Sequence, residues 1–104
     1  MLVPTIDPTE VPDPLPEGTT ILDVREDVEW NAGHIDGALH IPMGQVPTRM
    51  AELPEGDLLV VCHVGARSAR VTAYLVGQGR EAANIDGGLV AWVAAGRPML
   101  GRVD

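Results

Sequence analysis

The amino-acid sequence predicts an α/β domain built on a mainly parallel sheet, and three observations support this fold class. The chain has 104 residues, which is the length of one domain. Short apolar segments alternate along it with segments of helical periodicity, the pattern of parallel strands joined by crossover helices. The run LLVVC at residues 58–62 is apolar throughout and uncharged, as expected for a strand buried on both faces of a sheet.

Residues 1–18 form an acidic, proline-rich segment ahead of the main domain. Five of the nine prolines fall here: Pro4, Pro8, Pro12, Pro14 and Pro16. Because proline donates no backbone hydrogen bond and restricts the residue before it, we expect an extended or loop-like path. A short edge strand near Leu2–Ile6 would make this segment part of the domain.

The next three elements alternate in type. Thr19–Val24 (TTILDV) is a β-branched run and predicts a buried strand. Glu26–Ala32 predicts a short helix ending at Gly33. Ala38–Ile41 predicts a further short strand, which Pro42 stops.

The middle of the chain predicts a helix, a turn and the central strand. We expect a helix over Val46–Leu53 despite Pro47, since proline is tolerated in a first helical turn. Residues 54–57 (PEGD) are typical turn residues. Leu58–Cys62 then forms the most apolar strand of the sequence.

The last third predicts two helices separated by one strand. In Arg67–Gln78, apolar side chains recur at helical spacing, and Gly77 and Gly79 close the segment. Ala83–Ile85 predicts a strand, and Leu89–Ala95 predicts a final helix ended by glycine and proline.

The charge distribution argues against a nucleic-acid partner, and the lack of a long apolar run argues against a membrane protein. Residues 1–36 hold nine acids and one arginine, so the formal net charge of −8 is concentrated there, and an acidic surface repels phosphate backbones. No stretch approaches the ~18 uncharged apolar residues that span a bilayer. The N-terminus lacks a basic region followed by an apolar run, and the single cysteine cannot form an internal disulfide. We therefore expect a cytoplasmic protein.

Cys62 is the candidate reactive residue, because in open α/β sheets ligands bind at the carboxyl ends of strands. The loop that follows it, HVGARS, leads into a predicted helix. A tight loop can turn its N–H groups inward, the helix start adds partial positive charge, and Arg67 can add a full charge. All three favour thiolate, so we expect a lowered pKa for Cys62, with Gly65 giving the loop a conformation that a side chain would oppose. The alternative is a buried cysteine that only fills the core.

Four segments in this order resemble the single-domain rhodaneses over about residues 19–98. They are Asp23-Val24-Arg25, GHIDGALHIP (33–42), CHVGARS (62–68) and IDGGLVAWVAAGRP (85–98). The resemblance implies a three-layer rhodanese-like fold over residues 19–104, with a five-stranded, mainly parallel sheet flanked by helices. It also implies that Cys62 carries a persulfide and that the loop binds the sulfur donor through His63, Val64, Gly65, Ala66 and Arg67.

The implied activity is sulfur transfer without a metal or organic cofactor. The Cys62 thiolate would take a sulfane sulfur from thiosulfate or from a persulfide, including one on a partner protein, and pass it to cyanide or a thiol. Thiosulfate is the less certain donor, because rhodanese loops that favour small anions often carry two basic residues after the cysteine, whereas this loop has His63 and Val64.

Two alternatives stay open. One is a sulfur-carrier or interaction module with little turnover. The other is a phosphatase or arsenate reductase on the same fold, which the loop length opposes. Cys62 to Arg67 inclusive is six residues, the length of a rhodanese loop, whereas the related phosphatases have one residue more.

The remaining polar candidates are interpreted as structural. We expect Arg25 to form an ion pair with Asp23 or Glu26. His34 and His40 have no recognisable metal-ligand spacing. His63 could either attract an anionic donor or point to solvent. The segment holding Gly87, Gly88 and Trp92 is interpreted as a helix start and packing.

Overall fold

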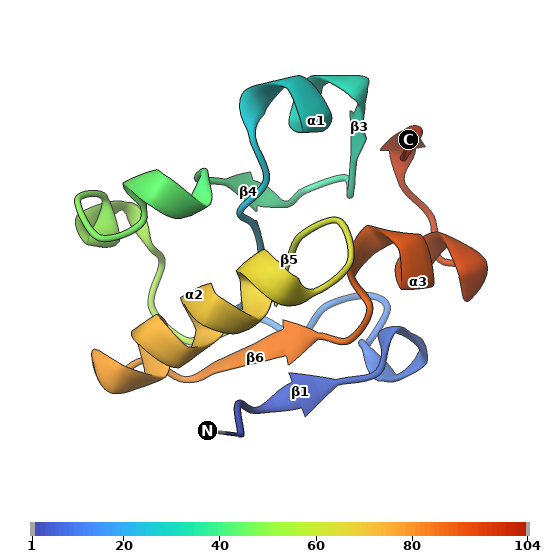
Figure 1. The fold of residues 1–104 in the computed structure, drawn as a ribbon. Coiled ribbons are helices and arrows are strands. Elements are labelled where there is room, and N and C mark those ends of the chain that lie inside the picture. The colour runs from blue at the N-terminus through green and yellow to red at the C-terminus, as the bar shows by residue number, and fades with distance from the viewer. Residues whose placement is uncertain (1, 104) are drawn as a thin grey trace.

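The computed structural model describes residues 2–103 and confirms the predicted α/β fold (Figure 1). Five strands form one sheet in the order β1-β6-β5-β2-β4, and all four neighbouring pairs are parallel. The strands are β1 (Thr5–Ile6), β2 (Thr19–Asp23), β4 (Leu39–His40), β5 (Asp57–Val61) and β6 (Ala82–Ile85). β5 is the middle strand, as the apolar run at residues 58–62 predicts.

Residues 2–103 also form three α-helices and three 3-10 turns. The helices are α1 (Asp27–Ala32), α2 (Ala66–Gly77) and α3 (Gly88–Ala94). The 3-10 turns are Pro8–Glu10, Met43–Gln45 and Met50–Glu52. α1 and the short strand β3 (Gly33–His34) lie together beyond the carboxyl edge of the sheet (Figure 1). None of the helices within residues 2–103 is long and apolar enough to cross a membrane.

Each face of the sheet carries its own apolar core, because successive side chains of a strand point to opposite faces. In β5, Leu58 and Val60 belong to one cluster and Leu59 and Val61 to the other. The first cluster packs under α2 through Val71 and Leu75. The second packs under α3 and the N-terminal segment through Val11, Leu89 and Trp92. The result is the predicted three-layer arrangement.

The prediction of a helix over Val46–Leu53 is wrong. One 3-10 turn, Met43–Gln45, ends just before Val46, and a second, Met50–Glu52, lies inside the segment and ends just before Leu53. Only Val46 and Leu53 are buried here, and Pro42, Gly44 and Pro47 oppose a continuous helix. A helix this short is marginal without an apolar face to pack, so short 3-10 connections replace it.

The other elements lie within three residues of their predicted ends, and the edge strand of the N-terminal segment is present as β1. The 3-10 turn Pro8–Glu10 and both strands of the small β3–β7 sheet were missed. β7 (Leu100–Gly101) pairs antiparallel with β3, in the register Gly33↔Gly101 and His34↔Leu100. Two-residue strands with glycines carry no alternating apolar pattern, so sequence periodicity could not reveal them.

Candidate active site around Cys62

Cys62 lies directly after β5, at the carboxyl end of the central strand. The residue is 1% exposed, so its sulfur lies inside the fold beneath the loop that follows it. This is the position where open parallel sheets bind ligands, and the structure therefore agrees with the place expected from sequence.

The loop residues after Cys62 have different environments. His63 is half-buried, whereas the side chain of Val64 is 59% exposed. Gly65 is buried at φ +104°, a left-handed conformation that favours glycine, and it caps the start of α2. Ala66 is the first residue of α2 and is exposed.

Two hydrogen bonds reach the sulfur directly. The backbone N–H of Gly65 lies 3.1 Å from Sγ, and the hydroxyl of Ser68 lies 3.2 Å from it. Burial raises the pKa of the Cys62 thiol, but hydrogen bonds from Ser68 and from the backbone N–H groups of Gly65 and Arg67 outweigh it. The net pKa is lower than the ordinary thiol value, which favours the nucleophilic thiolate.

The start of α3 supports the loop from behind. The N–H groups of Leu89 and Val90 donate to the carbonyls of Cys62 and His63 at 2.9 and 3.1 Å. Gly88 makes this approach possible, since a Cβ on it would lie 2.6 Å from the Cys62 carbonyl oxygen, and its φ is +64°. The predicted helix-start role of Gly87 and Gly88 therefore includes contact with the loop.

The guanidinium of Arg67 faces Glu29 of α1. Its Nη1 and Nη2 bind the two carboxylate oxygens at 2.7 and 2.9 Å. This pair raises the pKa of Arg67 and lowers the pKa of Glu29 to about 2. Arg67, which the sequence analysis expected to favour the thiolate, is therefore paired with Glu29. The contacts that lower the pKa of Cys62 come from backbone N–H groups and from the hydroxyl of Ser68.

The ion pair expected between Arg25 and a nearby acid is formed with Asp23, and both side chains are buried. Arg25 Nε and Nη2 bind the Asp23 carboxylate at 2.9–3.1 Å, and Nη2 also donates to the carbonyl of Gly33 at 2.7 Å. These contacts tie the carboxyl end of β2 to β3. Arg25 therefore braces the wall of the site.

His34 and His40 are structural, as expected. Both rings stack on the indole of Trp30, with centroids 3.7 and 4.7 Å away. His34 Nδ1 is 2.9 Å from the carbonyl of Trp30, and His40 Nε2 is 2.7 Å from the carbonyl of Arg25. The two rings therefore fix α1 against the end of β2.

Sequence reasoning missed two residues that the geometry brings to the site, Ser68 and Glu29. Ser68 stands in the quoted loop motif, and its place one residue after Arg67 was the available signal. Glu29 lies 38 residues before its partner Arg67, and a single carboxylate in a segment rich in acids carries no signal of its own.

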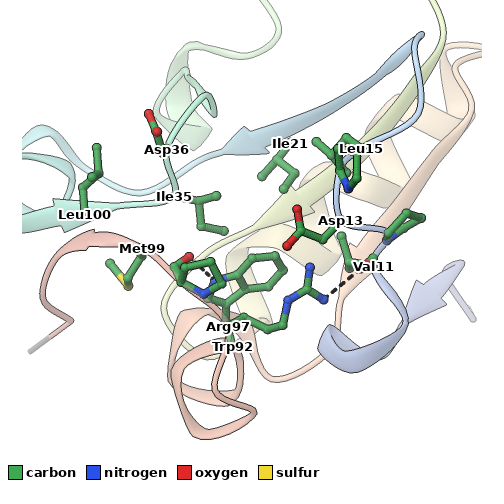
Figure 2. Close-up of a pocket in the computed structure, with 13 residues that line it drawn as sticks. Val11, Asp13, Leu15, Ile21, Ile35, Asp36, Trp92, Arg97, Met99 and Leu100 are labelled. Carbon is green, nitrogen blue, oxygen red and sulfur yellow. Dashed lines mark hydrogen bonds between the residues drawn. The ribbon is translucent and has the colours of Figure 1, made fainter.

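A pocket of about 460 Å³ lies away from the cysteine loop, between the N-terminal segment and the chain after α3 (Figure 2). Its floor is apolar and includes Ile21, Ile35 and Trp92. The guanidinium of Arg97 lies 4.5 Å from the centre of the Trp92 ring and donates to two backbone carbonyls of the N-terminal segment. Residues 62–68 do not line this pocket, so it is separate from the sulfur site.

The model of the rhodanese-like domain family matches residues 7–95. A sulfurtransferase of Allochromatium vinosum is 38% identical over 86 residues, covering 81% of this chain and 80% of that protein. The thiosulfate sulfurtransferase GlpE of Pseudomonas entomophila is 42% identical over 79 residues, 73% of this chain and 72% of that protein. A putative sulfur carrier protein of Bacillus subtilis, YrkF, is 40% identical over 73% of this chain and 42% of its own length.

Solved structures show the same relationship. The crystal structure of a rhodanese-related protein from Thermoplasma volcanium superposes with a TM-score of 0.86 at 26% identity, covering 95% of this chain and 99% of that one. With the sequence match, the parallel sheet and a cysteine loop at the carboxyl end of its central strand, the chain belongs to the rhodanese-like domain family.

Proposed function

We propose that this protein is a rhodanese-type sulfurtransferase that carries a sulfane sulfur on Cys62. The observation that carries the proposal is the environment of Sγ. The sulfur is buried at the end of the central strand, yet it accepts hydrogen bonds from Gly65 and Ser68 that favour its anionic form. A cysteine that only filled the core would need neither donor.

The reaction is a double displacement. The Cys62 thiolate attacks the outer sulfur of thiosulfate, a new S–S bond forms, and the old S–S bond breaks so that sulfite leaves with its electron pair. A persulfide donor reacts in the same way and releases a thiolate. A nucleophilic acceptor, cyanide or a thiol, then attacks the outer sulfur and Cys62 departs as the thiolate. Both steps balance with no external oxidant or reductant.

The loop supplies the electrostatics of this cycle. The persulfide is an anion, and the backbone N–H groups of Gly65, Arg67 and Ser68 at the start of α2 already act on the sulfur that carries it. The left-handed Gly65 turns its own N–H toward the sulfur. Preorganised donors of this kind favour the thiolate in the resting protein and the thiolate leaving group in the second step.

Intact mass spectrometry tests the proposal. Because Cys62 is the only cysteine, a gain of one sulfur atom after incubation with thiosulfate or a small persulfide assigns the site directly. We expect the gain in the wild-type protein, its loss on addition of cyanide, and no gain in Cys62→Ser. A protein that takes up sulfur from none of these donors would contradict the proposal.

A sulfur carrier is the second candidate, favoured by the identity to a relative named as one. Steady-state turnover separates the two, since a carrier would load sulfur once and release it to cyanide no faster than a free thiol persulfide does. A phosphatase or arsenate reductase is tested by aryl phosphate hydrolysis. We expect none, because the loop from Cys62 to Arg67 is one residue shorter than phosphatase loops of this fold.

A further inference from the structure

A small pocket of about 160 Å³ adjoins the loop that holds the sulfur. Three distant parts of the chain meet in it: the end of β2 with α1, the residue after Cys62, and the C-terminal segment. The residues that line it are Arg25, Val28, Glu29, Ala32, His63 and Arg102. Because His63 directly follows Cys62 and Glu29 holds Arg67, the pocket lies next to the cysteine loop.

The backbone around β7 fixes where Arg102 enters this pocket. The N–H of Arg102 donates to the carbonyl of Ala32 at 3.1 Å, one residue beyond the Gly33↔Gly101 pair. Gly33 and Gly101 pack backbone against backbone, since a Cβ on Gly33 would overlap Arg102 and one on Gly101 would overlap Ala32. Gly101 also has φ +68°, so this turn of the chain is built around glycine.

The segment before and after Arg102 is anchored to the core. The carbonyl of Pro98 accepts a hydrogen bond from Trp92 Nε1 at 2.9 Å. Met99 and Val103 pack against the core cluster under α3. Figure 2 shows Met99 and Leu100 beside Ile35 at the rim of the larger pocket. The C-terminal segment thus contributes to the lining of both pockets, Leu100 to the larger one and Arg102 to the smaller one.

The charges in the small pocket have different tasks. The guanidinium of Arg25 is committed to Asp23 and Gly33, and the carboxylate of Glu29 is committed to Arg67. Arg102 adds a guanidinium with five N–H donors, so it can contact an oxyanion while it keeps a contact with the protein. A space of about 160 Å³ suits a small oxyanion and is well below the size of ordinary organic-ligand pockets.

We propose that Arg102 is a positioning residue for anionic sulfur donors, holding the sulfonate oxygens of thiosulfate or a thiosulfonate at the small pocket while the outer sulfur reaches Cys62. This inference rests on the proposed function. It also supplies, from the C-terminal segment, a basic group in place of the one missing at the second position after Cys62, where Val64 stands. The sulfite that leaves carries its electron pair and negative charge toward this guanidinium, so the contact helps both capture and departure.

The test compares two donors on four proteins. Thiosulfate carries the oxyanion, and 2-hydroxyethyl persulfide carries a transferable sulfur without one. The proteins are the wild type, Arg102→Ala, Arg102→Lys and the control Arg80→Ala. Arg80 donates to the carbonyls of Pro54 and Gly56, which precede β5, so the control removes the same charge at the opposite end of that strand. The melting temperature of each variant checks its fold.

We expect kcat/KM for thiosulfate to fall about three- to tenfold in Arg102→Ala, mainly through KM, as for one partly exposed charged contact. Arg102→Lys should recover most of the loss, and Arg80→Ala should stay close to the wild type. The rate of sulfur loading from 2-hydroxyethyl persulfide should be the same in all four proteins.

Unchanged thiosulfate loading in Arg102→Ala, or an equal loss with both donors, would overturn the role of Arg102 and leave sulfur transfer standing. The role would also fall if the wild type loaded from the persulfide and not from thiosulfate. A wild-type protein that loaded from neither donor would overturn the proposed function itself, together with this inference.

Discussion

The carboxylate of Glu29 binds both terminal nitrogens of Arg67, at 2.7 and 2.9 Å, and so joins α1 to the first turn of α2 beside the cysteine loop. Glu29 Oε1 also accepts the backbone N–H of Glu26 at 3.0 Å, which caps the start of α1. One carboxylate therefore fixes the beginning of a helix and the direction of the loop arginine. Because the pair is bidentate and about 30% exposed, it is better placed than an ordinary surface ion pair to contribute to stability.

We predict that Glu29→Gln removes part of the acid sensitivity of folding. The pKa of Glu29 in the folded protein is about 2, below its ordinary value of 4.5, so the pair stabilises the fold above about pH 5 and loses its effect as the pH falls toward 2. The expected contribution near neutral pH is of the order of 2–3 kcal/mol. Urea unfolding at a series of pH values measures it.

Glu52→Gln is the control, because Glu52 pairs with Arg49 on an exposed part of the surface and should change stability less. The difference in the free energy of unfolding between the wild type and Glu29→Gln should become smaller as the pH falls. A difference that stayed constant down to about pH 2 would show that the ion pair is not its source.

Ser68→Ala should raise the pKa of the Cys62 thiol, because it removes the buried hydroxyl that donates to Sγ. Less thiolate is then present at neutral pH, so we expect sulfur loading to slow by about tenfold, the value of one hydrogen bond to a charged group. The rate of alkylation by iodoacetamide as a function of pH measures the shift, and its midpoint should move to higher pH.

Thr72→Val is the matched control for this prediction. The hydroxyl of Thr72 is also fully buried and one turn further along α2, but it donates to the carbonyl of Ser68 at 2.8 Å and not to sulfur. Thr72→Val should lower the free energy of unfolding without moving the pH midpoint of Cys62 alkylation. If both variants shifted the midpoint equally, the hydroxyl contact with the sulfur would not be responsible.

The fold was predictable where a buried element has a regular pattern of apolar residues in the sequence. β5 is the centre of the sheet and reads as an unbroken apolar run, while α2 shows its buried face at helical spacing in Val71 and Leu75. The region from Met43 to Leu53 was not, because two anchoring side chains with proline between them fit a short helix as well as two turns. The β3–β7 pair depends on backbone contact between glycines, which leaves no periodic signal.

The site divides in the same way. The place of Cys62 and the conformation of Gly65 follow from local sequence, since a strand end, a glycine and a helix start are all adjacent in the chain. The partners of the charged groups do not follow from local sequence. Glu29 binds the loop arginine from 38 residues away, and Arg102 lines the same pocket as His63 from the far end of the chain. The acid that meets Arg67 is decided by the packing of α1 and not by the sequence near Arg67.

Arg25→Met should destabilise the protein strongly. The arginine is 2% exposed, and its loss leaves the Asp23 carboxylate, which is 0% exposed, without a charged partner. Breaking a buried pair by removing one member costs about 3–5 kcal/mol. The double variant Asp23→Asn with Arg25→Met should recover part of this loss. Denaturant unfolding of four proteins (the wild type, Asp23→Asn, Arg25→Met and the double variant) gives the coupling energy, and a cost of Arg25→Met below about 1 kcal/mol would mean that the pair does not brace the site.

Gly88→Ala should damage both stability and the reactivity of Cys62. A Cβ at this position would lie within van der Waals overlap of the Cys62 and His63 carbonyls, and φ +64° is unfavourable for alanine. The start of α3 or the cysteine loop must therefore move. We expect a loss of about 2–4 kcal/mol and a changed rate of Cys62 alkylation.

Gly77→Ala is the matched control, because Gly77 is helical and nothing lies within 4 Å of the Cβ it would gain. That variant should gain about 0.5–1 kcal/mol through the reduced entropy of the unfolded chain, and its Cys62 should react as in the wild type. Thermal unfolding and iodoacetamide kinetics on both variants make the comparison. Wild-type stability and reactivity in Gly88→Ala would show that the loop does not depend on the close approach of α3.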